Sequence, residues 1–367
     1  MENLVLYRKY RPQTFAEVAG QEHVIKTITN ALLQNRVAHS YLFTGSRGTG
    51  KTTVARLLAK AINCLEPGFE PCNKCSACLE INGGRSFDLI EIDAASNRGI
   101  DEIRELRDGI KFMPAALKKK VFIIDEVHML TQPAFNALLK TLEEPPVYAL
   151  FILATTEIHK VPQTIISRCQ KFDFRKLPLE KIIERLAFVA KEEKVKIAQP
   201  ALELVAANAD GCVRDAESLL GQVMAMEDQE ITLEEVQNIL GVTDIKAVRD
   251  FVGWLAERKN GEAIRHLNNI ANEGYDLVQF NKSLVSYLRK MMIIKADNSL
   301  AKLAAPELTD EQLSVILSQG QKFPESDLVK LIHLFIDAEG DIKSLDFPQL
   351  PLELAVVEFC ENSPAEI

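Results

Sequence analysis

A glycine-rich segment near the N-terminal end has the residue types that a phosphate-binding loop requires. It fits the pattern G-x-x-x-x-G-K-[ST] and lies between a strand-like run, Tyr41–Thr44, and a helical run, Val54–Ala61. The glycines let backbone N–H groups turn toward phosphate oxygens, and the N-terminus of the helix adds partial positive charge. We therefore expect ATP to bind here, with the lysine reaching the β- and γ-phosphates and the last threonine ligating Mg²⁺. The candidate nucleotide-binding residues are Gly45, Ser46, Arg47, Gly48, Thr49, Gly50, Lys51 and Thr52.

A pair of carboxylates ends the predicted buried strand Val121–Asp125. Asp125 is placed to hold Mg²⁺ directly or through water, and Glu126 is the candidate general base that activates the attacking water. A protein that only binds a nucleotide has no need of the second carboxylate, so the pair favours hydrolysis; an exposed acidic pair without a role is the alternative. Thr155, which ends the next predicted strand, would bring a hydroxyl close to the γ-phosphate.

Two arginines are candidates for sensing the nucleotide. Arg168 precedes the last predicted strand, from where it could reach the site of a neighbouring subunit as an arginine finger. The alternative for Arg168 is a surface salt bridge. Arg214 begins a predicted helix after the strand-rich region, and from there it could touch the γ-phosphate and couple the nucleotide to the angle between domains.

A cluster of cysteines follows the phosphate-loop helix. Cys64, Cys72, Cys75 and Cys78 fall within fifteen residues, with prolines and a glycine in the longest gap that favour a loop. Four thiolates suit tetrahedral Zn²⁺ and leave no open coordination position, so the metal would be structural. An iron–sulfur cluster and unliganded thiols are the alternatives.

The spacing of apolar residues predicts an α/β domain followed by helices. Short runs rich in Val, Ile, Leu and Phe alternate with helical stretches up to residue 177, which predicts a doubly wound parallel sheet. After Pro178 no strand-like runs are predicted. We expect an α/β nucleotide-binding domain at 1–177, a helical lid at 178–242 and a helical C-terminal domain at 243–367. The predicted strands are Tyr41–Thr44, Asp88–Asp93, Val121–Asp125, Ala149–Thr155 and Gln170–Phe174, and the predicted lid helices are Glu180–Glu193, Pro200–Asn208, Arg214–Met226 and Leu233–Leu240.

The composition excludes several classes of protein. A hydrophobic fraction of 47% with 26% charged residues is ordinary for a globular protein, and a net charge of −9 excludes a globally basic coat for nucleic acid. A local basic patch stays open. No apolar run approaches the roughly 20 residues that cross a bilayer, and the start lacks the features of a signal peptide, so we expect a cytoplasmic protein without membrane contact.

Taken together, these residues resemble the bacterial DNA polymerase III gamma/tau family, the ATPase of the clamp loader. The opening segment Tyr7–Phe15 resembles the part of that family that lines the adenine pocket, and the four-cysteine insertion is a family hallmark. The motifs Asp125–His128, Asn136–Pro146 and Ser167–Cys169 match as well, whereas Cys212 stands where relatives often carry Ser. The resemblance is dense to about residue 242 and thin beyond it.

The resemblance implies an AAA+ ATPase module with a lid and an oligomerisation collar. Lys51, Thr52, Asp125, Glu126, Thr155 and Arg214 would act within one subunit and Arg168 on a neighbour. The chain would be an ATP hydrolase within the DNA polymerase III holoenzyme, with no polymerase active site of its own. Copies of it would form an open pentamer with the delta and delta-prime subunits, open the ring-shaped sliding clamp (beta) and load it onto primed DNA. The absence of the long tau extension fits a shorter gamma-like form or a truncated chain equally well.

Three other interpretations compete with this one. Asp125–His128 also resembles the DExH box of a helicase, but that class needs a second α/β motor domain. A Holliday-junction motor or another AAA+ motor of replication or repair would share the ATP chemistry but would not be expected to carry the four-cysteine insertion. A scaffold like delta-prime would be expected to have a damaged phosphate loop, whereas Lys51 and Thr52 are both in place.

Overall fold

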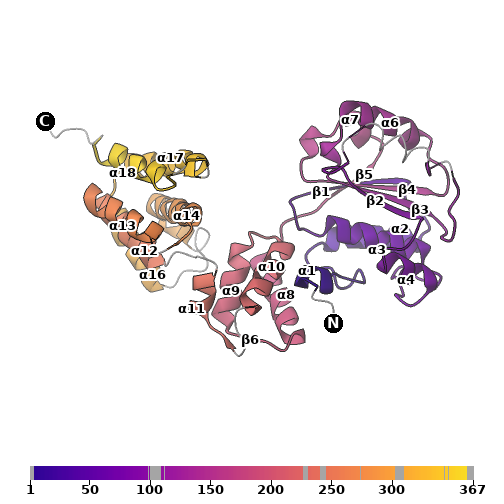
Figure 1. The fold of residues 1–367 in the computed structure, drawn as a ribbon, viewed down its shortest axis with the longest axis horizontal. Coiled ribbons are helices and arrows are strands. Elements are labelled where there is room, and N and C mark those ends of the chain that lie inside the picture. Colours follow the sequence, from indigo (N-terminus) through magenta and orange to yellow (C-terminus); the bar gives the residue numbers. More distant parts are fainter. Residues whose placement is uncertain are drawn as a thin grey trace. The chain divides into compact units, whose positions relative to one another are not determined.

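The computed structural model describes residues 4–97, 99, 109–110, 112–225, 230–239, 245–272, 274–301, 310–342, 344–345 and 347–361. The chain divides into two compact units, 1–233 and 234–367 (Figure 1). The predicted domain boundary between residues 242 and 243 lies outside the described residues, as do the predicted helix ends at Met226 and Leu240. None of the described helices combines the length and the apolar character needed to cross a membrane.

Five parallel strands form the sheet of the first unit within the described residues, in the order β2-β3-β4-β1-β5. The order places β1 in the interior of the sheet, so the loop that follows it emerges beside the end of β4, with the end of β3 one strand further along. Thr44 pairs with Thr155, and Asp93 with Asp125, which brings the carboxyl ends of four strands to one edge. The strands are β1 Ser40–Thr44, β2 Leu89–Asp93, β3 Lys120–Asp125, β4 Ala149–Thr155 and β5 Gln170–Asp173.

Helices cover both faces of this sheet, as Figure 1 shows. Side chains of β1 alternate between two buried clusters, with Tyr41 and Phe43 facing one and Leu42 facing the other. The first cluster includes α2 (Glu22–Leu33) and α3 (Lys51–Asn63), and the second includes α6 (Gln132–Glu143) and α7 (Gln163–Ile166). This is the predicted α/β class, because strands buried on both faces need apolar residues at successive positions.

The rest of the first unit is helical, with short elements that the apolar pattern does not predict. The two-residue strands β6 (Lys196–Ile197) and β7 (Glu230–Ile231) pair in parallel, so the expectation of no strands after Pro178 was wrong. Two residues are too few to produce a period. The helices here are α8 Leu179–Glu192, α9 Gln199–Asn208 and α10 Val213–Met224. Helix α11 Leu233–Ile239 begins at the last residue of this unit and otherwise belongs to the second unit. Short elements elsewhere are α1 Leu6–Lys9, α4 Ser76–Asn82, η1 Val127–Met129 and η2 Ile158–Lys160.

The second unit, in its described part, consists of helices around an aromatic core. Phe251, Phe280, Phe335 and Phe359 are each buried in one cluster. Rings of Phe251 and Phe280 meet edge to face at 5.4 Å between centroids, a geometry that adds to the stabilisation from buried area. The helices are α12 Ile245–Ala256, α13 Asn260–Asn272, α14 Leu277–Ala296, η3 Asn298–Leu300, α16 Asp310–Gly320, α17 Glu325–Ile342 and α18 Leu350–Glu361.

Candidate active site

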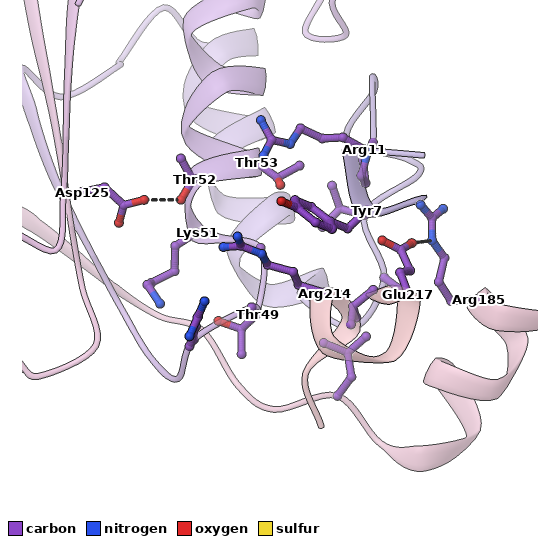
Figure 2. Close-up of a pocket in the computed structure, with 18 of the residues that line it drawn as sticks. Tyr7, Arg11, Thr49, Lys51, Thr52, Thr53, Asp125, Arg185, Arg214 and Glu217 are labelled. Atoms are coloured by element: carbon purple, nitrogen blue, oxygen red, sulfur yellow. Dashed lines mark hydrogen bonds and ion pairs between the residues drawn. The ribbon is translucent and has the colours of Figure 1, made fainter. Parts of the chain in front are cut away.

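The glycine-rich loop after β1 forms one wall of a cavity of about 500 Å³ in the first unit (Figure 2). Gly45 and Gly48 have φ values of 142° and 71°, in the region that side chains other than glycine avoid. A Cβ on Gly45 would lie 2.2 Å from the carbonyl oxygen of Phe174, and one on Gly48 would lie 2.0 Å from the sulfur of Cys212. Both glycines are therefore required by the packing of this loop as well as by its turn.

Lys51 begins helix α3 and folds back over the loop. Its ammonium donates to the carbonyl oxygens of Gly45 and Ser46, at 2.8 Å each. Burial lowers the pKa of Lys51, and the nearby carboxylates of Glu126 and Asp125 oppose that effect. A buried ammonium that is held only by carbonyls and two nearby acids is well placed to accept a polyanion.

Thr52 and Asp125 meet across the cavity from two different elements. The Thr52 hydroxyl at the start of α3 donates to Oδ2 of Asp125 at the end of β3, at 2.7 Å (Figure 2). A hydroxyl and a carboxylate oxygen are ligands that Mg²⁺ accepts together with phosphate oxygens. The contact exists because the strand order brings the end of β3 close to the loop that follows β1.

Glu126 follows Asp125 in a left-handed conformation, with φ of 47°. Such a backbone in a non-glycine residue costs energy, and it occurs most often at functional sites. The Glu126 carboxylate lines the cavity and accepts a hydrogen bond from the Thr156 hydroxyl at 2.9 Å. The hydrogen-bond network thus holds the candidate base in a defined position beside the nucleotide loop.

Thr155 is fully buried, and its hydroxyl lies 3.0 Å from Nδ1 of His128. It also accepts a hydrogen bond from the backbone N–H of Glu157. Among the described residues, it is the adjacent Thr156 that bonds Glu126. The role of Thr155 toward the γ-phosphate stays a prediction.

Arg214 at the first turn of α10 reaches into the cavity beside the phosphate-loop helix (Figure 2). Its guanidinium lies 4.7 Å from the centroid of the Tyr7 ring, and a hydrogen bond to Arg214 lowers the pKa of the Tyr7 phenol. The sulfur of Cys212 accepts the backbone N–H of Asp215 and caps this helix. The cap sets the direction in which Arg214 leaves the helix.

The cavity contains an ion pair that the sequence analysis missed. Arg185 of α8 and Glu217 of α10 meet at 2.8 Å, and both side chains are largely buried. Burial raises the pKa of Glu217, and the guanidinium of Arg185 opposes that effect. Arg185 also donates to the Tyr10 carbonyl, which ties the helical region to the N-terminal segment. The only available signal was a glutamate on the apolar face of a helix.

Arg168 lies away from this cavity, at the end of α7. It pairs with Glu143 and donates to the Thr164 carbonyl at 2.7 Å. Arg168 is not among the described residues that line the cavity. This position fits a finger that acts on a neighbouring subunit, and the salt bridge with Glu143 also fits the structural alternative, so the finger stays a prediction.

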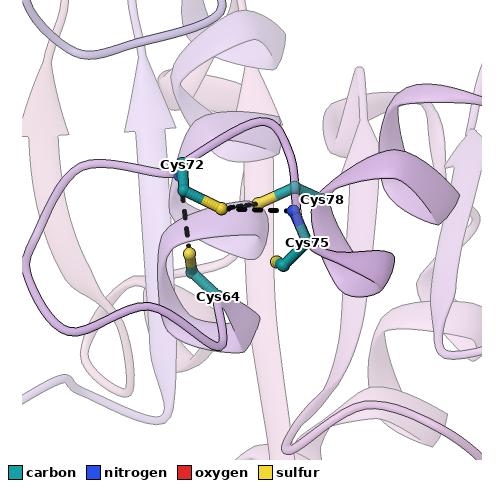
Figure 3. Close-up of side chains that lie close together, drawn as sticks. All are labelled: Cys64, Cys72, Cys75 and Cys78. Carbon is teal, nitrogen blue, oxygen red and sulfur yellow. Dashed lines mark hydrogen bonds between the residues drawn. The ribbon is translucent and has the colours of Figure 1, made fainter.

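The cysteines gather into one cluster, as Figure 3 shows. The sulfur atoms of Cys64, Cys72, Cys75 and Cys78 lie within 4.8 Å of one another. Zn–S bonds of about 2.3 Å in a tetrahedron place sulfurs roughly 3.8 Å apart, so a modest contraction would close the site around zinc. Burial raises the pKa of Cys78 to about 12, whereas backbone N–H groups of Lys74 and Cys75 lower that of Cys72. The donor set fits a structural zinc ion.

Comparisons with known proteins agree with this geometry. Family models described as "DNA polymerase III, delta subunit", "DNA polymerase III clamp loader subunit, ATPase lid domain" and "DNA polymerase III subunits gamma and tau domain III" match residues 20–178, 181–229 and 231–366. The DNA polymerase III subunit tau of Bacillus subtilis is 42% identical over 364 residues, which cover 99% of this chain and 64% of that protein. The tau subunit of Escherichia coli is 41% identical over 318 residues, covering 86% of this chain and 49% of that protein.

The chain belongs to the gamma/tau family of DNA polymerase III subunits. It spans 64% and 49% of the lengths of these two gamma/tau relatives. Among solved structures, the RuvB Holliday junction branch migration motor of Thermotoga maritima aligns with a TM-score of 0.48 at 19% identity, over 72% of this chain and 84% of that chain. The fold is a parallel α/β module followed by a region that matches a clamp-loader ATPase lid and a helical C-terminal region that matches gamma/tau domain III, as the resemblance to the gamma/tau family implied.

Proposed function

We propose that this chain is the ATPase subunit of a bacterial clamp loader, and that it uses ATP to open a sliding clamp and load it onto primed DNA. The observation that carries the proposal is the meeting of Lys51, Thr52 and Asp125 at one end of a cavity that Arg214 enters from a lid helix. A nucleotide in this cavity would touch both the sheet domain and the lid. Binding and release of the nucleotide would therefore change how the lid packs against the sheet domain.

Lys51 and the loop amides would hold the triphosphate. On binding, the Lys51 ammonium exchanges the carbonyls of Gly45 and Ser46 for β- and γ-phosphate oxygens, which are charged acceptors and bind it more strongly. Thr52 and Asp125 would hold Mg²⁺, which neutralises the charge that develops on the phosphates. The hydrogen bonds to these two carbonyls satisfy the buried ammonium of Lys51.

Glu126 would accept a proton from the attacking water. Its bond to Thr156 holds the carboxylate at the edge of the cavity, and the general base must lie within hydrogen-bond reach of that water. Arg168 of a neighbouring subunit would stabilise the charge of the transition state, as arginine fingers do in related phosphoryl transfers. Hydrolysis would then depend on assembly, with further copies of this chain and the delta and delta-prime subunits in a pentamer.

Arg214 would link the nucleotide to lid position. The Arg214 guanidinium would leave the Tyr7 ring and turn to the γ-phosphate. Binding or loss of that phosphate would therefore shift the position of helix α10. Three domains would carry out these steps: 1–177 for the chemistry, 178–242 as the lid and 243–367 as the oligomerisation collar. The compact unit that begins at 234 and the lid match at 181–229 support this division.

Cys64, Cys72, Cys75 and Cys78 would hold one structural zinc ion. The closed set of four sulfurs supports this assignment, because it leaves no position for a substrate. Metal analysis of the purified chain should give about one zinc per chain. Iron in place of zinc, or freshly prepared protein without metal, would contradict the assignment.

An ATPase assay with and without the sliding clamp and primed DNA tests the function. We expect slow turnover by the assembled complex alone and a clear stimulation only when clamp and primed DNA are both present. Another AAA+ motor would respond to a different DNA structure and would ignore the clamp. Turnover that is indifferent to both additions would therefore overturn clamp loading while leaving ATP hydrolysis intact.

A further inference from the structure

The cysteine loop, residues 64–78, contacts the part of the chain that forms one side of the nucleotide cavity. We name residues 11–19 the pocket wall, because Arg11, Pro12, Glu17, Val18 and Ala19 line the cavity. The wall contains no helix or strand, so no ladder of backbone hydrogen bonds holds it in shape. Three of its backbone groups, the N–H groups of Phe15 and Ala16 and the carbonyl of Gln13, find partners in the cysteine loop, whereas the Gln13 N–H is accepted by Glu17 of the wall itself.

Both carboxylate oxygens of Glu70, in the cysteine loop, accept hydrogen bonds from the pocket wall. Oε2 accepts the backbone N–H of Phe15 at 2.8 Å, and Oε1 accepts that of Ala16 at 3.1 Å. Phe15 is 1% exposed and lies in the core beneath the sheet, so these two bonds act at the point where the wall enters the core. Charge-assisted bonds of this kind are stronger than neutral ones.

Asn73 of the cysteine loop makes the second attachment. Its Nδ2 donates to the carbonyl of Gln13 at 3.0 Å, and its Oδ1 accepts from the ammonium of Lys60 at 2.8 Å. Lys60 belongs to the phosphate-loop helix α3, is only 2% exposed, and also donates to the side-chain and backbone oxygens of Gln13. One buried ammonium thus joins the cysteine loop, the pocket wall and the phosphate-loop helix.

The metal cluster would hold both attachments in place. Asn73 lies between Cys72 and Cys75, Glu70 lies two residues before Cys72, and Cys64 is the C-cap of α3. Asn73 has a left-handed backbone with φ of 58°, a conformation that asparagine adopts more readily than most residues. Residues 64–75 contain no helix or strand, so we expect a metal held by the cysteines to add a strong constraint on the positions of Glu70 and Asn73.

We propose that Glu70 and Asn73 are positioning residues through which the metal-closed cysteine loop holds the pocket wall in its nucleotide-binding shape. The zinc site then contributes to ATP affinity, beyond its contribution to folding, although it lies outside the nucleotide cavity. The inference rests on the proposed function, since it requires that the cavity bind ATP.

The test measures the dissociation constant of a fluorescent ATP analogue together with zinc content. Glu70→Ala should keep one zinc per chain, because every cysteine ligand remains, and should weaken nucleotide binding about fivefold to tenfold. Glu70→Gln, which keeps an acceptor oxygen, should restore part of the affinity. Glu66→Gln removes an exposed carboxylate from the same loop and should change neither quantity.

Chelation of the metal separates the proposal from a general loss of stability. In the wild-type chain, zinc removal should weaken the analogue by a factor similar to that of Glu70→Ala. In Glu70→Ala combined with Asn73→Ala, removal should add little, because the connection is already cut. Circular dichroism shows in each case whether the chain is folded, and Glu70→Gln serves as the milder variant if Glu70→Ala does not fold.

The two possible failures are distinguishable. Equal nucleotide affinity in the wild-type chain and Glu70→Ala, or full additivity of chelation and substitution, would overturn the role of the cysteine loop. A wild-type chain that carries zinc but binds no ATP analogue would instead overturn the proposed function itself.

Discussion

The nucleotide cavity and the C-terminal helical unit are built in different ways. Around the cavity, polar side chains such as Lys51, Asp125 and Glu126 lie at the ends of buried helices and strands, where the buried element fixes the backbone conformation. The helical unit is held by an apolar core with Phe251, Phe280 and Phe335 at its centre. Phosphate chemistry fixes residue types and spacing, whereas core packing fixes only apolar character and volume. This is why the motifs that suggested the gamma/tau family lie in the first region, although the domain III family model matches residues 231–366 as well.

The largest expected effect lies in the chemical region. Arg168→Ala should slow ATP hydrolysis in the assembled complex by about 10³–10⁵-fold, because arginine fingers stabilise transition-state charge to that extent. ATP binding should stay unchanged, since Arg168 does not line its own cavity in the described part of the chain. Lys171→Ala, which removes another partly exposed cation of the same segment, is the matched control. Wild-type turnover by Arg168→Ala would leave only the salt bridge with Glu143 as its role.

Glu126→Gln should affect hydrolysis alone. Loss of a general base slows a reaction by about 10²–10⁴-fold, and the amide still fits the space beside Thr156. Single-turnover measurements should show tight ATP binding with a slow chemical step. Weakened binding with an unchanged chemical step would mean that Glu126 belongs to the binding set.

Phe251→Ala probes the other side of the comparison. Truncation of this fully buried ring should destabilise the helical unit by about 3–5 kcal/mol, measured by denaturant unfolding. Nucleotide affinity should not change, because the two units have separate cores. Leu354→Ala, at an exposed position, should cost less than about 0.5 kcal/mol. A parallel loss of ATP affinity in Phe251→Ala would remove the distinction between the regions.

The smallest expected effect is a loss of stability, and it concerns the carboxylate of Asp88, which directly precedes strand β2. Asp88 is 2% exposed and accepts backbone N–H groups of Ala115, Ala116 and Leu117 at 2.8–2.9 Å. Burial raises the pKa of Asp88, but these hydrogen bonds and Lys120 outweigh it and hold the pKa below the usual value. Asp88→Asn should cost about 1–3 kcal/mol at neutral pH.

The lowered pKa of Asp88 predicts how the stability of the chain depends on pH. A carboxylate with a lowered folded pKa stabilises the protein above its unfolded pKa of about 3.9, and this contribution is lost as the pH falls through the folded value. The free energy of unfolding of the wild-type chain should therefore approach that of Asp88→Asn in acid. A constant difference between the two chains from pH 7 to pH 3 would contradict the role of the Asp88 charge.

The sequence predicts the phosphate-loop end of the cavity better than the part that the lid helices line. Lys51, Thr52 and Asp125 come together as expected, because the βα pattern predicts a parallel sheet whose strands all end at the same edge, and the spacing within the phosphate loop is set by the ligand. The Arg185–Glu217 pair could not be predicted, since it joins two helices whose packing no local pattern specifies. The predicted strands Asp88–Asp93 and Gln170–Phe174 are each one residue longer than β2 and β5, although the Asp88 carbonyl and the Phe174 N–H still bond the neighbouring strands. Assigned strand ends commonly differ by a residue in this way.

Calorimetric titration of the purified chain with ATP and Mg²⁺ tests the central claim most directly. The account predicts about one ATP per wild-type chain, and at least about 100-fold weaker binding by Lys51→Ala, because the triphosphate loses its only buried ammonium among the cavity residues that the structure describes. Equal binding by Lys51→Ala, or no heat of binding from the wild-type chain, would contradict it.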